Sequence, residues 1–351
     1  MRAVGETFRS AGVTAIYLVH GTFVGDDALG FMHKLAGALP SAAIALRRKQ
    51  KQTLDSLLKD GGNYTPDYAS EFERAINCEG QPHIPLRLFY WSSENHHIGR
   101  AHAAVELIDE LAARHPTAEG RILLWGHSHA GNVFALLTNL LGADLEARDR
   151  FFAAARSYYR WPLIGRIDLP VWPRVQSLLD ADALPLAKAL DIVTFGTPIR
   201  YGWDMSGCSR LLHFVNHRPA PGRPAHQAVF PPSIDDVLSA AGGDYIQQLG
   251  IAGTNFSPDI FAWRTWLADL RLKRLLQPRL RQRDLLARLS AGVRVADQGK
   301  TLLVDYGPGE GHIGQHIAGH AVYTRLEWLL FHAEQVARRV YGSNDSKPRP
   351  S

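Results

Sequence analysis

Short apolar runs that alternate with segments of helical periodicity constrain the fold of this chain more than any other feature. Each run gives way to Gly, Ser, Asn or another turn-forming residue. Near-continuous hydrophobicity over so short a length is typical of strands that are buried on both faces. The four strongest runs are AIYLVHGT, LRLFYWSS, RILLWGHS and DIVTFGTP, and two weaker ones are RLLHFVNH and KTLLVDYG.

Helical patterns lie between these runs. The segment from Arg100 to Arg114 carries Val105, Ile108 and Leu111 at helical spacing, and further patterns cover residues 132–142 and 320–340. Parallel strands need long crossover connections, which helices usually supply. The sequence therefore predicts an α/β fold with a mostly parallel sheet that is flanked by helices.

Two long stretches interrupt the alternation, at residues 143–190 and 219–298. The first is rich in aromatic residues and proline, and the second holds a Pro-rich part and a basic helix. Loops of this length inside a compact domain are commonly lids or small subdomains, although surface decoration is the alternative. We expect one domain over residues 1–342, with a cap insertion at 143–190, a second insertion that carries the basic helix at 219–298, and a disordered tail at 343–351.

The net charge of +5 is too small for this length to favour nucleic-acid binding. Much of the excess lies in residues 263–289, where Leu267, Leu270, Leu275 and Leu276 recur at roughly helical spacing. The basic residues are then expected on the solvated face of an amphipathic helix. Contact with an anionic membrane surface or an anionic substrate remains the alternative.

Cysteine content and hydropathy indicate the compartment. Cys78 and Cys208 are too few for a disulfide framework and lack metal-ligand spacing, although a single bridge is not excluded. The apolar run near the N-terminus has no cleavage site, so we interpret it as a strand rather than a signal peptide. No stretch approaches the about 20 apolar residues of a membrane span. A cytoplasmic protein is expected.

Ser128 lies in GHSHAGN, where an apolar run meets a helical pattern. A serine nucleophile on a sharp strand-to-helix turn requires small residues two positions before and after it, so that strand and helix can approach. Gly126 and Ala130 occupy these positions. The sequence thus predicts a nucleophile elbow, with a serine in an ordinary turn as the alternative.

Several motifs in this order resemble the α/β-hydrolase superfamily, in particular its serine lipases and esterases. The resemblance extends from about Thr14 to Tyr341 and rests on LVHGTF, GHSHAGN, VTFGTPIRYGW, LLHFVNHRPAPG and AGHAVYTR. It implies an α/β-hydrolase fold in which Ser128 is the nucleophile. It also implies that the backbone N–H of His129 and an N–H of Thr22 or Phe23 form an oxyanion hole.

The base must be chosen among sixteen histidines. The side chains of His127 and His129 diverge from the serine hydroxyl on a strand-turn-helix, whereas His320 matches the late histidine of the resembled family. His312, His316 and His320 are spaced by four, which would suit a metal on a helix. The glycines among them disfavour such a helix, so we expect neither a metal nor a cofactor.

The acid is not settled by the resemblance. The resembled lipases carry an aspartate three residues beyond the asparagine that corresponds to Asn216, and here that position is Pro219. Three aspartates are candidates: Asp204 after one strand, which we prefer, Asp305 at the end of another, and Asp244 in the second insertion. A carboxylate needs only to reach one N–H of the imidazole.

These expectations lead to a serine hydrolase that cleaves carboxylic esters of hydrophobic or lipid-like acyl groups. The aromatic insertion would form a cap over the acyl site. An acyltransferase, a thioesterase, an amidase or a non-catalytic binding protein of the same fold are the alternatives. In YWSSENHH, polar residues including Ser92, Glu94, Asn95 and His97 either line the pocket or cap the following helix.

Overall fold

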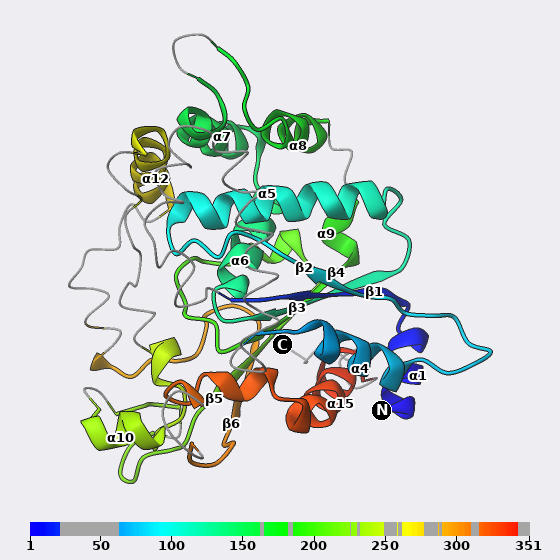
Figure 1. Cartoon of the computed structure of the whole chain (residues 1–351), viewed down its shortest axis with the longest axis vertical. Helices are drawn as coiled ribbons and strands as arrows, with labels where there is room; N and C mark the ends of the chain where they lie inside the picture. Colours follow the sequence, from blue (N-terminus) through cyan, green and yellow to red (C-terminus); the bar gives the residue numbers. More distant parts are fainter. Residues whose placement is uncertain are drawn as a thin grey trace, which may run out of the picture.

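The core of the protein is a six-stranded, all-parallel sheet with the strand order β2-β1-β3-β4-β5-β6. The computed structural model describes residues 1–21, 63–161, 165–181, 185–224, 226–229, 232–248, 258, 262–276, 287, 290–309 and 316–342. All six predicted strands are confirmed (Figure 1). They are β1 (Val13–Val19), β2 (Leu86–Phe89), β3 (Arg121–His127), β4 (Leu190–Phe195), β5 (Arg210–Asn216) and β6 (Lys300–Val304).

Helices connect the strands and include the three that the sequence predicted. These are α5 (His97–Arg114), α6 (Ala130–Gly142) and α15 (Leu329–Val340), the last of which is preceded by the short 3-10 turns η2 (Ala321–Thr324) and η3 (Leu326–Trp328). The apolar run near the N-terminus is the strand β1, as interpreted, and a helix, α1 (Arg2–Ser10), precedes it. The other helical elements are α4 (Pro66–Ile76), α7 (Leu145–Tyr159), α8 (Val171–Asp180), α9 (Leu186–Ala189), η1 (Met205–Gly207), α10 (Ile234–Ser239) and α12 (Trp263–Leu276).

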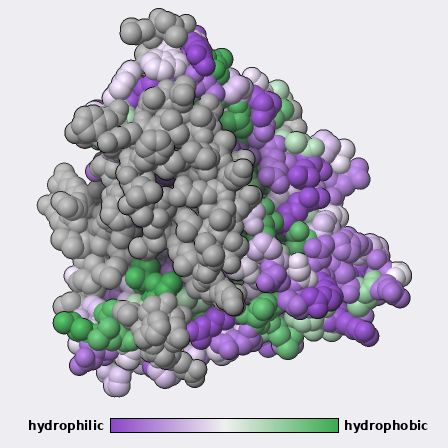
Figure 2. All heavy atoms as spheres, viewed as in Figure 1, coloured by the Kyte–Doolittle hydropathy of each residue, from purple (hydrophilic) through white to green (hydrophobic). Residues whose placement is uncertain are grey.

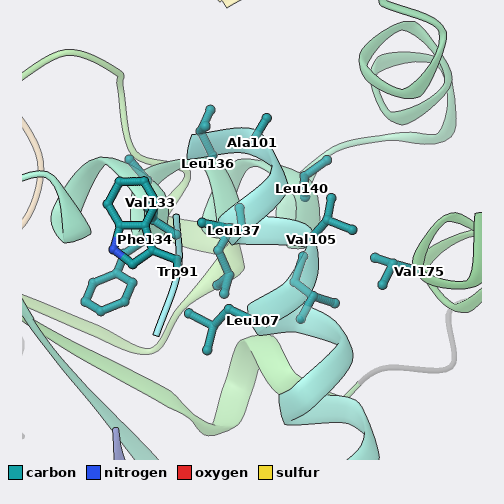
Figure 3. Close-up of a cluster of buried hydrophobic side chains, with 14 of the residues drawn as sticks. Trp91, Ala101, Val105, Leu107, Val133, Phe134, Leu136, Leu137, Leu140 and Val175 are labelled. Atoms are coloured by element: carbon teal, nitrogen blue, oxygen red, sulfur yellow. The ribbon is translucent and has the colours of Figure 1, made fainter. Parts of the chain in front are cut away.

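Alternate side chains of the strands pack against two separate helical layers. On β1, Tyr17 belongs to the cluster shared with α5 and α6, whereas Ile16 and Leu18 belong to the cluster shared with α1, α4 and α15. Figure 1 shows these layers on opposite faces of the sheet. In the first cluster, Val105 of α5 and Leu137 of α6 are both buried (Figure 3). The near-continuous apolar runs therefore reflect burial on both faces.

The aromatic residues of the first insertion extend the hydrophobic cluster of α5 and α6 outward. Trp172 of α8 stacks on Tyr159 of α7 with ring centroids 5.2 Å apart, and its indole N–H donates to Nδ1 of His102 on α5 at 3.0 Å. Phe152 packs edge-on against the same indole. These side chains are buried between helices and stabilise the layer outside α5. That the insertion covers an acyl site stays a prediction.

The basic helix α12 belongs to the same outer layer. Its residues Arg271, Lys273 and Arg274 are exposed as expected, but Arg264 is buried. The Arg264 guanidinium forms an ion pair with Asp168 at 2.7 Å and donates to the carbonyl oxygen of Ser157 on α7 at 3.0 Å. The two insertions are therefore joined, because α12 comes from the second and α7 from the first. The rest of the predicted basic segment, apart from Ala287, lies outside the described residues.

Sheet topology determines where a ligand can approach. After β1 the chain forms β2 on one side of β1, and it then crosses to the other side to form β3. The connections that leave β1 and β3 therefore run in opposite directions, which makes the carboxyl ends of these two strands a topological switch point. In open parallel sheets, ligands bind in the crevice at such a switch point. His20 and Gly21 follow β1, and Ser128 follows β3, so the predicted elbow lies there.

None of the helices in the described ranges is long and apolar enough to cross a membrane. Cys78 and Cys208 are both free thiols, so the bridge that the sequence left open is not formed.

A buried ion-pair cluster lies at the amino-terminal edge of the sheet, opposite the switch point. Its contribution to stability can be tested without altering the switch point. Asp191 at the start of β4 is fully buried and accepts from Arg121 of β3 at 2.6 Å and from Arg210 of β5 at 3.4 Å. We expect Asp191→Asn to lower the free energy of unfolding by about 2–3 kcal/mol, because it leaves two guanidinium groups without their carboxylate. Urea unfolding would measure this loss.

The matched control is Asp109→Asn. Asp109 forms a bidentate pair with Arg174 at 2.6 Å, but that arginine is 53% exposed. Exposed pairs contribute less than about 1 kcal/mol. Equal losses in the two variants would contradict a special role for the buried pair.

Candidate active site

Ser128 occupies a strained turn between β3 and α6. Its φ angle is +56°, in the left-handed region that side chains other than glycine rarely adopt. Two hydrogen bonds hold the turn: Ser128 N–H donates to the carbonyl oxygen of Phe195 at 2.8 Å, and the Thr197 hydroxyl donates to the carbonyl oxygen of Ser128 at 2.9 Å. Both partners lie at the end of the neighbouring strand β4, so the sheet itself stabilises the turn.

Small residues allow β3 and α6 to approach, as the motif predicted. A Cβ atom on Gly126 would lie 2.4 Å from the ring of Phe134 and 3.1 Å from Cβ of Ala130. A Cβ atom on Gly21 would lie 2.5 Å from Cβ of Ser128, so the segment after β1 passes directly beside the serine. The turn therefore has the steric properties of a nucleophile elbow.

Residues that follow β2 hold the segment after β1 in place. The indole N–H of Trp91 donates to the carbonyl oxygen of His20 at 2.8 Å, and the two rings stack with centroids 5.9 Å apart. The hydroxyl of Ser93 lies 3.3 Å from the carbonyl oxygen of Gly21. The predicted oxyanion-hole residues Thr22 and Phe23 follow immediately, but they lie outside the described residues.

His320 contacts one carboxylate, that of Asp244. The distance from Nδ1 of His320 to Oδ2 of Asp244 is 2.7 Å, and Asp244 is fully buried. The other carboxylate oxygen accepts from the backbone N–H of Gln247 at 2.8 Å. Burial acts to raise the pKa of Asp244, but His320, the backbone N–H of Gln247 and the Arg294 charge together outweigh it and hold this pKa below the usual value. Asp244 is therefore an ionised acceptor for the imidazole.

The carboxylate of Asp204, the acid that the sequence analysis preferred, is bound away from His320. Its carboxylate accepts from the backbone N–H and the hydroxyl of Ser206, at 2.9 Å and 2.6 Å, and so caps η1. The carboxylate of Asp305 instead forms an ion pair with Arg218 at 3.0 Å. Asp244 was the third candidate, and it alone among the three is at hydrogen-bond distance from His320.

Tyr323 completes the surroundings of the acid, and sequence reasoning missed it. Its hydroxyl donates to Oδ2 of Asp244 at 3.0 Å and accepts from the backbone N–H of Asn216 at 2.7 Å. Burial and the Asp244 charge raise the pKa of Tyr323 well above its usual value, so the group remains a hydroxyl. Tyr323 lies in η2, whose N-cap is His320.

His127 supports His320 instead of replacing it. The two rings pack with centroids 4.6 Å apart, and Nε2 of His127 lies 3.2 Å from the carbonyl oxygen of His320. The Nε2 atom of His320 itself is buried and makes no hydrogen bond to any described residue. The imidazole of His320 thus has one nitrogen fixed by a carboxylate and the other available for proton transfer beside the elbow.

The polar segment before α5 forms a helix-capping network. His96 is the N-cap, and its Nδ1 accepts from the backbone N–H of Gly99 at 2.9 Å. Asp269 of α12 accepts from the N–H of Ile98 at 3.0 Å, so the outer layer contributes to the same cap. His97 lies 2.8 Å from the hydroxyl of Tyr201, which follows β4. The segment therefore links α5 to the β4 end of the candidate site.

Within the described ranges, no group of three His, Cys, Asp or Glu side chains could hold a metal ion. His316 is buried, and His312 lies outside the described residues.

Ser128, the imidazole of His320 bound to Asp244 and the start of α6 all lie at the carboxyl edge of the sheet, and Ser128 is not at hydrogen-bond distance from Nε2 of His320. These are the groups that nucleophilic catalysis at a carbonyl requires. A scan against protein-family models, a search of curated proteins and a search of solved structures each found no match to this chain.

Proposed function

We propose that the protein is a serine hydrolase of the α/β-hydrolase kind that cleaves carboxylic esters. The contact between His320 and Asp244 beside the Ser128 turn carries this proposal. The three residues follow the chain order serine, aspartate, histidine that is typical of this fold. The all-parallel sheet, with the serine on a strand-to-helix turn, is the structural context that the motif requires.

In the proposed reaction, the Ser128 hydroxyl attacks the ester carbonyl while Nε2 of His320 accepts its proton. Asp244 stabilises the resulting imidazolium and holds the proton of the imidazole on Nδ1. The backbone N–H of His129, at the start of α6, would stabilise the oxyanion. His320 then protonates the leaving alcohol, and a water molecule releases the acyl group from Ser128.

Exposed apolar side chains beside the Asp244 loop support a hydrophobic acyl group. Ile234 and Leu238 of α10 are 79% and 48% exposed, and Ile246 is 39% exposed. Figure 2 shows hydrophobic surface over α10. Apolar surface next to a reactive centre favours an apolar substrate.

A fluorophosphonate probe tests the nucleophile. We expect the wild-type protein to be labelled at Ser128 and Ser128→Ala to be neither labelled nor active on p-nitrophenyl esters, because the attacking oxygen is gone. Peptide mass spectrometry locates the label. Ser206→Ala, which alters a serine at η1, should be labelled like the wild type. An unlabelled wild-type protein would refute the hydrolase proposal, and an active Ser128→Ala variant would refute the choice of nucleophile.

Asparagine variants test the acid. Asp244→Asn should reduce kcat by about three to four orders of magnitude, because asparagine cannot stabilise the imidazolium. Asp204→Asn and Asp305→Asn are the matched controls and should stay within about threefold of the wild type, since both carboxylates bind elsewhere. Steady-state kinetics on one ester provide the measurement. A larger loss in either control than in Asp244→Asn would remove Asp244 from the mechanism.

A further inference from the structure

Arg294 is a buried arginine near the end of the second insertion, shortly before β6. Its exposed fraction is 1%. The guanidinium donates to the carbonyl oxygens of Asn216 at 2.9 Å and Gly242 at 2.7 Å, and to the side-chain oxygen of Gln248 at 3.0 Å. None of these three acceptors is charged, and burying a cation on neutral acceptors costs free energy. Packing alone would be served better by an apolar side chain of similar length.

These contacts fasten the segment that carries the acid to the sheet. Two of the three acceptors are the first and last residues of the acid segment (residues 242–248), and the third ends β5. The φ angle of Gly243 is +98°, and a Cβ atom there would lie 2.9 Å from Nη1 of Arg294. The guanidinium therefore lies directly against the backbone that precedes Asp244.

Gln247 extends the same set of contacts to the serine turn. Its backbone N–H donates to Oδ1 of Asp244 at 2.8 Å. Its side-chain nitrogen donates to the carbonyl oxygens of Arg294 at 3.1 Å and Thr197 at 3.3 Å. The hydroxyl of Thr197 in turn donates to the carbonyl oxygen of Ser128. Gln247 is fully buried, so a continuous chain of shielded hydrogen bonds joins Arg294, the acid segment and the serine turn.

The charge of Arg294 acts in the same direction as its hydrogen bonds. Burial lowers the pKa of Arg294, and the charge of Asp244 opposes this effect. The Arg294 charge is in turn one of the influences that hold the pKa of Asp244 below its usual value. Because both groups are buried, their mutual attraction is weakly screened.

We propose that Arg294 is a positioning residue for the acid. Its guanidinium holds the acid segment against the end of β5, so that Oδ2 of Asp244 stays 2.7 Å from Nδ1 of His320. This inference rests on the proposed function, because it assumes that His320 is the base and Asp244 its partner. Arg294 acts through Asp244 and not on the substrate, so its removal should affect kcat more than KM.

Arg294→Met removes the donors and keeps much of the side-chain length. It should lower kcat by about 30- to 100-fold, because a displacement of about 1 Å at a reacting group costs about two orders of magnitude. KM should stay within about threefold of the wild type. Arg294→Lys keeps the charge and one donor group, so it should lose only about five- to tenfold in kcat, and it replaces Arg294→Met in every comparison if that variant does not fold.

Arg148→Met is the matched control. The Arg148 guanidinium also binds three carbonyl oxygens, those of Leu140, Leu141 and Leu179 at 3.1, 3.0 and 2.6 Å, but it does so at the end of α6 that is remote from the serine turn. Its kcat should stay within about threefold of the wild type. Equal kcat losses in Arg148→Met and Arg294→Met would contradict a specific role for Arg294.

A double-mutant cycle separates positioning of the acid from general damage. In an Asp244→Asn background, Arg294→Met should lower kcat by less than about threefold, because the group that Arg294 positions is already lost. A purely structural arginine would lower kcat by a similar factor in both backgrounds. Equal factors would therefore overturn the inference.

Proton NMR gives a readout that needs no activity. The proton between His320 and Asp244 should give a low-field signal, assigned by its loss in Asp244→Asn. The signal should be lost or shifted in Arg294→Met and retained in Arg148→Met. An unchanged signal in Arg294→Met would overturn the inference, while a loss of kcat in Asp244→Asn would still support the proposed function. If the wild type hydrolyses no ester and Ser128 takes no label, the proposed function fails, and the NMR comparison still decides whether Arg294 positions Asp244.

Discussion

The left-handed backbone at Ser128 is the constraint on which the rest of the site depends. A residue held in this conformation costs about 1–3 kcal/mol, so the surrounding structure must stabilise it. The end of β4 does so through the carbonyl oxygen of Phe195 and the hydroxyl of Thr197. Because the turn is bonded to its neighbouring strand, the serine has a fixed position relative to everything else at the carboxyl edge of the sheet.

The acid shows why order in the sequence did not determine the partner of His320. The resemblance expected a carboxylate just after Asn216, and none is there. Asp244 lies much further along the chain, yet its backbone N–H donates to the carbonyl oxygen of Asn216 at 2.9 Å. The loop thus returns to the end of β5 and delivers an acid close to the expected place. Closing a longer loop adds little entropic cost, so chain distance is a poor guide to spatial distance.

Strands were easier to predict than the layers that cover them. The six apolar runs predict β1 to β6 because strands that are buried on both faces carry apolar residues at nearly every position. By contrast, α7 and α8 bury large aromatic side chains such as Trp172 against other helices, which obscures their periodicity. Ser128 and His320 were predicted from local motifs, whereas Tyr323 and Arg294 act through tertiary contacts that no local pattern encodes.

Charge is distributed asymmetrically about the serine. On the side of α5 and β4, burial and the Arg100 charge lower the pKa of Arg200 to about 10, so the Arg200 guanidinium remains cationic. On the opposite side, Asp244 is held as an anion against His320. In the proposed reaction the proton moves toward the carboxylate, while negative charge develops on an oxygen beside His129, within the influence of the two cations. The charges of Arg100 and Arg200, which after burial lower the pKa of His129, would therefore also stabilise that oxygen.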